Sequence, residues 1–246
     1  MQLAITTVSY EGYANEAWND KRLRVAERAL IKACELGAHV LVLPGGFFTT
    51  RTDKARNSIA THLINIAKRQ NVAAIFGVDQ HVKNLSADYG PEIKRGALPF
   101  YAYVWSPIDE GPPLPWNQRS TNSQNQVEAP EALCREVRLI KITDDETVAI
   151  LICGEIFNQR IRYALAEYRP RPKLVVDIAH TGHRFRVEQG MKKLAEQGFS
   201  SVCSVHVQCE FAMKRCYIAG KGLASTRTCD ASLFGLPSIE LKLCTF

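Results

Sequence analysis

The sequence lacks any apolar run close to the roughly 20 residues that a helix needs to cross a bilayer. It also lacks a positively charged start, because the opening MQLAITTVSY carries no Lys or Arg and has the pattern of a strand. Neither a membrane-spanning helix nor a cleaved secretion signal is therefore expected. We predict a cytoplasmic protein with no membrane partner.

Closely spaced cysteine pairs are missing as well. The chain has eight cysteines, mostly in apolar stretches, but no Cys-x-x-Cys pair. Structural zinc sites are typically built from such pairs, so no metal is expected. In the absence of an export signal, the cysteines are predicted to be reduced thiols.

A basic stripe with interleaved aromatic residues is also absent. The Lys and Arg, 31 in all, are scattered among 25 Asp and Glu, which leaves a formal net charge of +6 and a sequence pI of about 8.9. Nucleic acid is therefore not expected as a partner, whereas a small anionic ligand suits a mildly basic protein.

The composition that remains is that of a globular protein, with 46% hydrophobic and 23% charged residues among 246. No Gly/Ser-rich linker divides the chain, so one domain over residues 1–246 is predicted. Short apolar runs alternate with helical patterns, which predicts an α/β fold with helices packed outside the sheets. The predicted helices cover 15–37, 53–71, 158–168 and 187–198. The predicted strands cover 3–10, 39–44, 72–78, 100–107, 136–142, 147–153, 173–179 and 200–207, with more in 217–226 and 231–243, and 109–129 is predicted as a long loop.

Three predicted strands end in residues suited to a site. Pro44-Gly45 follows the strand 39–44, Cys153-Gly154-Glu155 follows 147–153, and His180 follows 173–179. In layered α/β folds, ligands lie beyond the carboxyl ends of the strands. A thiolate is a strong nucleophile, and a helix beginning near Asn158 directs free N–H groups toward the region of Cys153. The alternative interpretation of Cys153 is an inert cysteine buried in a strand.

The order of these segments resembles the nitrilase, or carbon–nitrogen hydrolase, superfamily over nearly the whole chain. AERALIKACELGAHVLVLPGGFF and LINIAKRQNVAAIFGV resemble its first two helices with their strands, and TVAILICGEIFNQRIRYALAEY resembles its nucleophile strand and helix. MKKLAEQGFSSVCSVHVQ and AGKGLAST resemble later segments. The resemblance implies a four-layer αββα sandwich, a homodimer or higher homo-oligomer, and a small amide-like ligand. It implies hydrolysis of non-peptide C–N bonds by a cysteine, a glutamate and a lysine, with no metal or organic cofactor.

Residue by residue, the resemblance holds only in part. Cys153 stands at the position of the nucleophile. Gly45 replaces the glutamate, and Gln118 with Arg119 stands where the lysine is expected. No lysine occurs between Lys94 and Lys141, so two of the three catalytic positions are replaced. Arg119 is either a substitute cation for the oxyanion or a solvated loop residue.

Other polar residues are candidates to line the pocket. Glu155 follows the nucleophile position, and Glu128 and Glu131 lie where an additional acid is expected from the resemblance. In DIAHTGHRFR, His180 is a candidate replacement base for Cys153. Arg184 is a candidate ligand for a substrate carboxylate.

The same DIAHTGHRFR segment allows two other interpretations of its histidines. His180 and His183 form a His-x-x-His pair, but no third ligand has a matching spacing, so a metal site is not predicted. They can also be surface-loop histidines without a chemical role.

Two function hypotheses remain open. In the first, the chain is a thiol amidohydrolase with unusual partners for Cys153. In the second, it is a pseudoenzyme that binds a small molecule or a protein through the inherited pocket. Gly45 and Gln118 favour the second hypothesis, and Cys153-Gly154-Glu155 favours the first.

Overall fold

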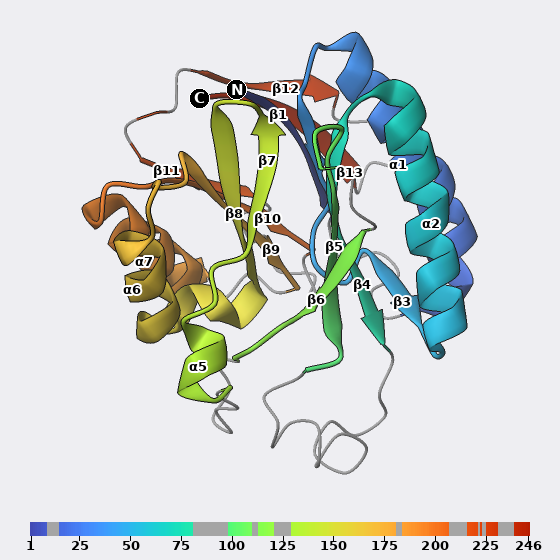
Figure 1. The fold of residues 1–246 in the computed structure, drawn as a ribbon. Coiled ribbons are helices and arrows are strands. Elements are labelled where there is room, and N and C mark those ends of the chain that lie inside the picture. Colours follow the sequence, from blue (N-terminus) through green and yellow to red (C-terminus); the bar gives the residue numbers. More distant parts are fainter. Residues whose placement is uncertain are drawn as a thin grey trace.

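The computed structural model describes residues 1–8, 15–80, 98–109, 113–120, 129–180, 184–206, 216–220, 222, 225–230 and 239–246. Two β-sheets lie face to face, and helices cover the outer face of each (Figure 1). The predicted αββα sandwich is therefore confirmed.

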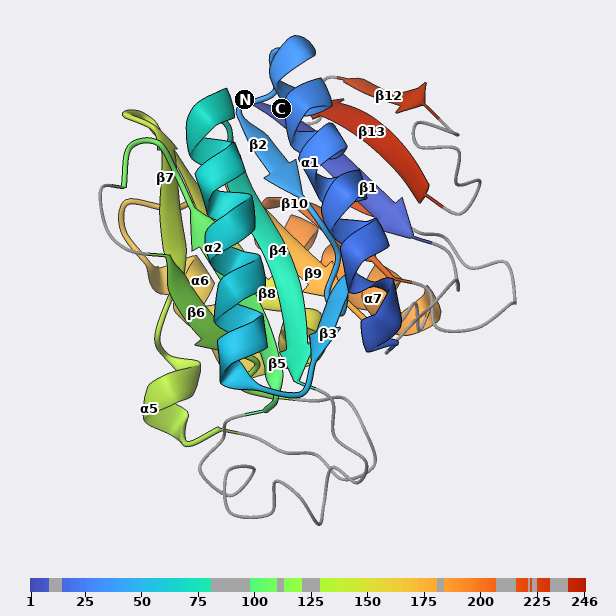
Figure 2. The ribbon, with the colours of Figure 1, turned by 90° about the vertical axis from the view of Figure 1, so that its right-hand side faces the viewer.

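The first sheet has eight strands among the described residues, in the order β12-β13-β1-β2-β4-β5-β6, with β3 joined to β4. β1, β2 and β4 run parallel to one another (Figure 2). The bounds are β1 Gln2–Val8, β2 Val40–Val42, β3 Phe48–Thr50, β4 Ala73–Gln80, β5 Phe100–Trp105, β6 Leu114–Asn117, β12 Ser225–Asp230 and β13 Ile239–Thr245.

The second sheet has the order β11-β10-β9-β8-β7 within the described part of the chain. β8, β9 and β10 are parallel, and β7 and β8 form the predicted hairpin. The bounds are β7 Leu139–Thr143, β8 Glu146–Ile152, β9 Leu174–Ala179, β10 Ser200–Val205 and β11 Cys216–Ala219.

Two helices cover each sheet on its outer side. α1 (Asn19–Glu35) and α2 (Asp53–Gln70) cover the first sheet, and α6 (Gln159–Glu167) and α7 (Arg184–Glu196) cover the second (Figures 1 and 2). The short elements are η1 Glu16–Trp18, α5 Glu131–Cys134 and η2 Cys153–Phe157. The side chain of Asn158 accepts hydrogen bonds from two N–H groups at the start of α6 and so caps that helix.

Three apolar layers hold the sandwich together. The middle layer lies between the sheets, where Ile5 and Val42 of the first sheet belong to the same buried cluster as Ile150 and Val176 of the second. The outer layers lie under the two helix pairs. Because side chains alternate along a strand, each buried strand supplies one face to the middle layer and the other to an outer layer.

The prediction of an unbroken loop over 109–129 was wrong, because β6 lies within it. β6 is the edge strand of the first sheet and contains Pro115. Proline is tolerated at a sheet edge, where its missing N–H removes no hydrogen bond from the sheet interior. The polar, proline-containing composition of this segment therefore did not indicate a strand.

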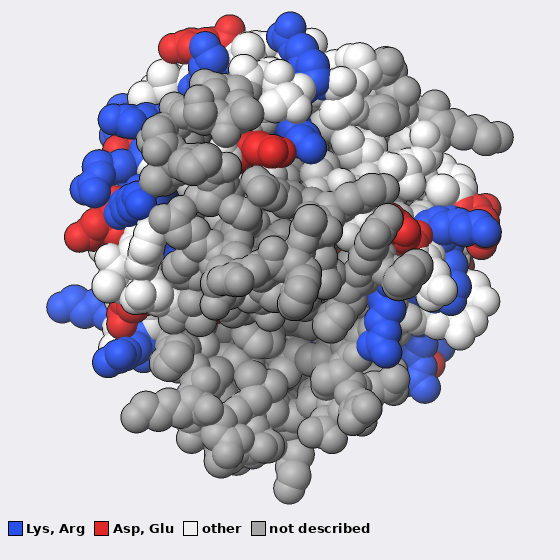
Figure 3. Space-filling model, turned by 180° about the vertical axis from the view of Figure 1, so that it is seen from behind, with Lys and Arg blue, Asp and Glu red and all other residues white. Residues whose placement is uncertain are grey.

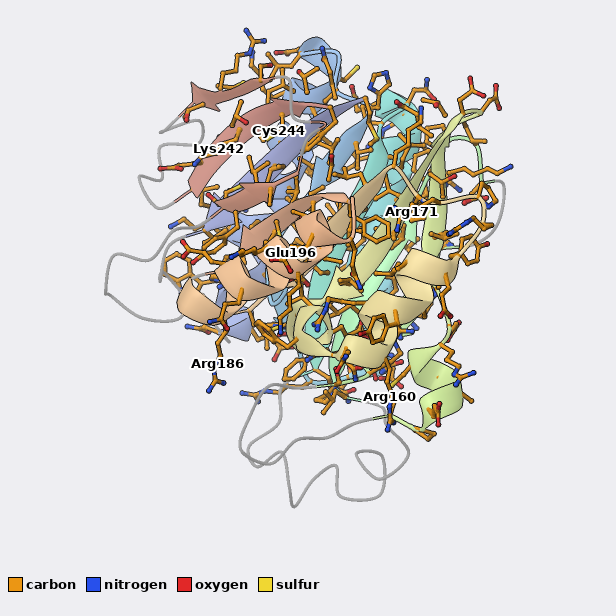
Figure 4. All side chains as sticks on the ribbon, turned by 90° about the vertical axis from the view of Figure 1, so that its left-hand side faces the viewer. Arg160, Arg171, Arg186, Glu196, Lys242 and Cys244 are labelled. Carbon is orange, nitrogen blue, oxygen red and sulfur yellow. The ribbon has the colours of Figure 1, made fainter. Side chains whose placement is uncertain are left out.

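The surface of the protein carries both positively and negatively charged side chains. On the face in Figure 3, Lys and Arg of the described residues stand among Asp and Glu around the margin. On the face covered by α6 and α7, Arg160 and Arg186 project outward, and both are exposed (Figure 4). No helix within the described residues is long and apolar enough to cross a membrane.

Candidate active site

The backbone turns sharply at Cys153, directly after β8. Cys153 opens η2 with a φ of 50°, in the left-handed region, and its side chain is half-buried. Holding a non-glycine residue in such a conformation costs on the order of 1–3 kcal/mol, and residues of this kind gather at active sites. The turn places the thiol at the carboxyl end of the second sheet.

The side chain of Glu155 stabilises this turn through hydrogen bonds. Its carboxylate is fully buried and accepts hydrogen bonds from the N–H of Ile152 at 3.2 Å and the N–H of Arg119 at 2.7 Å. The guanidinium groups of Arg119 and Arg138 approach the same carboxylate at 3.0 and 3.2 Å. The carboxylate oxygens are thus occupied by the chain itself.

The interpretation of Arg119 as a solvated loop residue is wrong. Only 3% of its side chain is exposed, because it lies against Glu155 and also donates to the carbonyls of Leu133 and Glu136. A buried guanidinium needs such partners, since desolvating an unpaired charge is costly. Arg119 therefore holds η2 in place through Glu155.

His180 lies at the end of β9 and is buried, with 4% of its surface exposed. The interpretation of His180 as a surface-loop histidine is therefore wrong. Its Nε2 lies 2.9 Å from Oδ1 of Asp79, which is itself 5% exposed at the end of β4. The Phe100 ring packs beside the imidazole, with 4.6 Å between ring centroids.

Gly45 makes room for this imidazole. A Cβ built at Gly45 would lie 3.1 Å from both Cε1 and Nε2 of His180, and 3.1 Å from the carbonyl oxygen of Ile178. Those distances are shorter than ordinary van der Waals contacts. The absence of a side chain at position 45 and the presence of the ring at position 180 are thus parts of one arrangement.

The Asp79–His180–Cys153 contacts favour the charged form of the imidazole. Burial acts to lower the pKa of His180, but the Asp79 carboxylate and the Cys153 sulfur outweigh it and raise that pKa well above its usual 6.5. Hydrogen bonds to Asp79 and Cys153 add to the effect. His180 therefore bridges a carboxylate from the first sheet and a thiol from the second.

No protein-family model matches the sequence, and no curated protein matches it. The fold, however, matches solved structures of an amidase from Nesterenkonia. A cysteine-to-alanine variant of the Nesterenkonia AN1 amidase, from the nitrilase superfamily, aligns with a TM-score of 0.66 and 14% identity, over 100% of this chain and 90% of that one. A glutamate-to-glutamine, cysteine-to-alanine double variant in complex with acrylamide gives a TM-score of 0.65 and 12% identity, over 100% and 90% of the two chains. The fold is that of the nitrilase superfamily.

Within this nitrilase-like fold, the structure brings together Gly45, Cys153 and His180 from three strand ends. Sequence reasoning missed Asp79. The available signal was an acidic residue at the end of the buried run VAAIFGVDQ, at the same edge as the other strand ends. Its relevance depends on the second sheet lying opposite, which the sequence does not display.

Gln118 is connected to His180 through Phe100. Its backbone N–H donates to the carbonyl of Phe100, whose ring packs on His180. The Gln118 side chain is 2% exposed and donates from Nε2 to the carbonyl of Ser120. A neutral amide therefore occupies the position where the resemblance implies a lysine.

The structure adds none of the remaining candidate residues to this group. Glu131 is on α5, where it forms an exposed pair with Arg135 at 2.7 Å. Glu128 and His183 lie outside the described residues, as does the side chain of Arg184, whose backbone begins α7. Within the described part of the chain, no three His, Cys, Asp or Glu side chains converge to hold a metal ion.

Proposed function

We propose that this protein is a cysteine-dependent hydrolase of small amides or related acyl compounds, with Cys153 as the nucleophile, His180 as its base and Asp79 as the residue that orients the base. One observation carries the proposal: the His180 imidazole fills the space beside Gly45 and connects Asp79 to Cys153. A nucleophile, a base and a residue orienting that base form the arrangement used for acyl transfer on unrelated folds.

The reaction follows from these positions. The Cys153 sulfur, whose proton the charged His180 imidazole already holds, attacks the substrate carbonyl carbon. The imidazolium then protonates the leaving nitrogen as the C–N bond breaks, which leaves an acyl thioester on Cys153. Water, deprotonated by His180, attacks that thioester and releases the carboxylic acid and the cysteine. Since Asp79 occupies Nε2, we assign the proton transfers to Nδ1.

The neighbours support a small substrate. Structures of the Nesterenkonia amidase contain acrylamide and butyramide, and one shows acrylamide added to the active-site cysteine. We infer that this chain also takes a short amide. Its fold matches that of the amidase, and Cys153 lies at the carboxyl end of β8 in that fold. The competing hypothesis, a binding scaffold without catalysis, is favoured by Gln118 in place of a lysine.

Amide hydrolysis by native protein, Cys153→Ala and Asp79→Asn distinguishes these hypotheses. We expect native turnover of short amides, none by Cys153→Ala, and a loss of about 10²–10⁴-fold in Asp79→Asn, because the imidazole loses its orienting carboxylate. Thermal unfolding of each variant serves as the control for folding. Native protein that binds short amides without hydrolysing them would favour the scaffold.

Gln118 is proposed to donate its second side-chain N–H to the oxyanion. Gln118→Ala is then expected to lower kcat by about 10²–10³-fold with a small change in KM, since the interaction strengthens in the transition state. The neighbouring amide Asn117 donates instead to the Leu98 carbonyl, so Asn117→Ala is the matched control. Equal kcat values for the two variants would remove Gln118 from the mechanism.

Two further proposals rest on the sequence resemblance and composition. We propose a homodimer or higher homo-oligomer, which light scattering would test, and a cytoplasmic location, which fractionation of the source cells would test.

A further inference from the structure

Arg138 connects the two sheets beside Gln118. It directly precedes β7, and its carbonyl accepts the N–H of Ile150 on β8 at 2.9 Å. Only 6% of the residue is exposed. One nitrogen of its guanidinium donates to Oε1 of Glu155 at 3.2 Å, and another donates to the carbonyl of Asn117, at the end of β6, at 2.6 Å. A side chain anchored beside the nucleophile strand thus holds the edge strand of the opposite sheet.

The carboxylate of Glu155 completes this connection on the other side of Gln118. Its Oε1 accepts the backbone N–H of Arg119 at 2.7 Å. Its Oε2 accepts the N–H of Ile152, the residue directly before the nucleophile, at 3.2 Å. The residues on both sides of Gln118 are therefore hydrogen-bonded to one buried ion pair, and the same ion pair is bonded to the nucleophile turn.

Gln118 needs such a connection because it follows an edge strand. Its N–H donates to the carbonyl of Phe100 at 2.9 Å, and its carbonyl accepts the N–H of Leu98 at 3.2 Å. These two bonds fix Gln118 within the first sheet, whereas Cys153 follows a strand of the second sheet. A misplacement of about 1 Å between reacting groups can cost about 10²-fold in rate, so the two sheets must be held in a fixed relation here.

We propose that Arg138 is a positioning residue that sets the distance between the Gln118 amide and the Cys153 sulfur. Its hydrogen bond to Asn117 holds the segment that carries the amide, and its ion pair with Glu155 holds the turn that carries the sulfur. Arg138 takes no part in the bond-making steps and acts through Gln118. This inference rests on the proposed function, in which the amide and the sulfur act on one carbonyl group.

Arg138→Met removes both hydrogen bonds and keeps an unbranched side chain. The guanidinium of Arg119 stays 3.0 Å from Glu155, so the buried carboxylate keeps a charged partner and the variant is expected to fold. We expect kcat to fall about 10–100-fold with a small change in KM, because a misplaced oxyanion donor weakens the transition state more than the bound substrate. In a Gln118→Ala background the same change should cost less than about threefold, since the donor that it positions is already gone.

Arg162→Met is the matched control. Arg162 is also a buried arginine, 5% exposed, and it donates to the carbonyl of Ile156 in η2 at 2.7 Å. This bond joins α6 to η2 and not to β6. Whatever its loss changes in kcat should therefore be the same with and without Gln118→Ala.

Butyraldehyde provides a measurement that needs no turnover. The Cys153 sulfur bonds to the aldehyde carbon, the C=O π bond opens, and the proton held by His180 passes to the oxygen, which lies where the oxyanion forms. Protection of Cys153 from iodoacetamide by butyraldehyde, mapped by mass spectrometry, therefore reports on the same donor. The concentration for half-protection should rise about tenfold in Arg138→Met and in Gln118→Ala, the value of roughly one hydrogen bond, and no further in the double variant.

Two results would overturn the proposal. One is a folded Arg138→Met protein with native kcat and native protection by butyraldehyde. The other is a loss that persists in full in the Gln118→Ala background. If Arg138→Met does not fold, Arg138→Lys takes its place under the same criteria, because it keeps a cation beside Glu155 without the two-pronged geometry of a guanidinium. Native protein that butyraldehyde protects but that hydrolyses no amide would contradict the hydrolase alone, whereas independent effects of Arg138 and Gln118 on protection would contradict the positioning role alone.

Discussion

His180→Ala is expected to lose about 10²–10⁴-fold of the Cys153-dependent amide hydrolysis of the native protein, the usual contribution of a positioned general base. The same change should remove any advantage of Cys153 over Cys34 in alkylation, because the imidazole no longer takes the thiol proton. Hydrolysis of a short amide and mass-spectrometric mapping of brief iodoacetamide labelling measure the two effects.

The matched control is His62→Ala. His62 is half exposed on α2 and pairs with Glu27 of α1, and both helices cover the outer side of the first sheet (Figure 2). It should leave both rates unchanged. A His180→Ala protein that keeps native turnover would show that another group accepts the proton.

Substitution of Gly45 tests the role of His180 more directly. Gly45→Glu alone should be as inactive as His180→Ala, because the new side chain begins 3.1 Å from the imidazole and displaces it. Gly45→Glu combined with His180→Ala frees that space for a carboxylate, and we expect it to recover at least tenfold over either single variant. Such a gain is the non-additivity shown by residues that share one role. A double variant no better than the single ones would mean that the two side chains do not exchange roles.

Glu155→Ala is expected to lower the free energy of unfolding by about 3–5 kcal/mol, the typical cost of breaking a buried ion pair from one side. The change leaves the guanidinium groups of Arg119 and Arg138 facing each other without their carboxylate. It also removes the acceptor for the Ile152 N–H just before Cys153. Urea denaturation followed by circular dichroism measures the loss.

Glu131→Ala is the control, since Glu131 pairs with Arg135 at 2.7 Å on the exposed surface of α5. Exposed pairs contribute about 0.2–1 kcal/mol, so this variant should unfold close to the native midpoint. Comparable losses of unfolding free energy in the two variants would contradict the stabilising role assigned to Glu155. Glu155→Gln should fall between them, because it keeps an acceptor but not the charge.

The layers of this protein could be predicted from its sequence. Apolar runs with period two and amphipathic runs with period 3.6 set the strands and helices of the sandwich, since burying one face of each element requires such spacing. The sequence also indicated that Gly45, Cys153 and His180 would meet, because the carboxyl ends of parallel strands lie at one edge. These are properties of segments and of their order along the chain.

The pairing of the polar residues, in contrast, depends on how the two sheets pack. Asp79 and His180 are 101 positions apart, and Arg119 and Glu155 are 36 apart. Burial of a charged side chain is stable only when a partner satisfies it, and the partner is chosen by how two sheets pack rather than by any local pattern. For that reason the sequence allowed His180 to be a surface histidine and Arg119 a solvated arginine, whereas the packed sheets place each against a carboxylate.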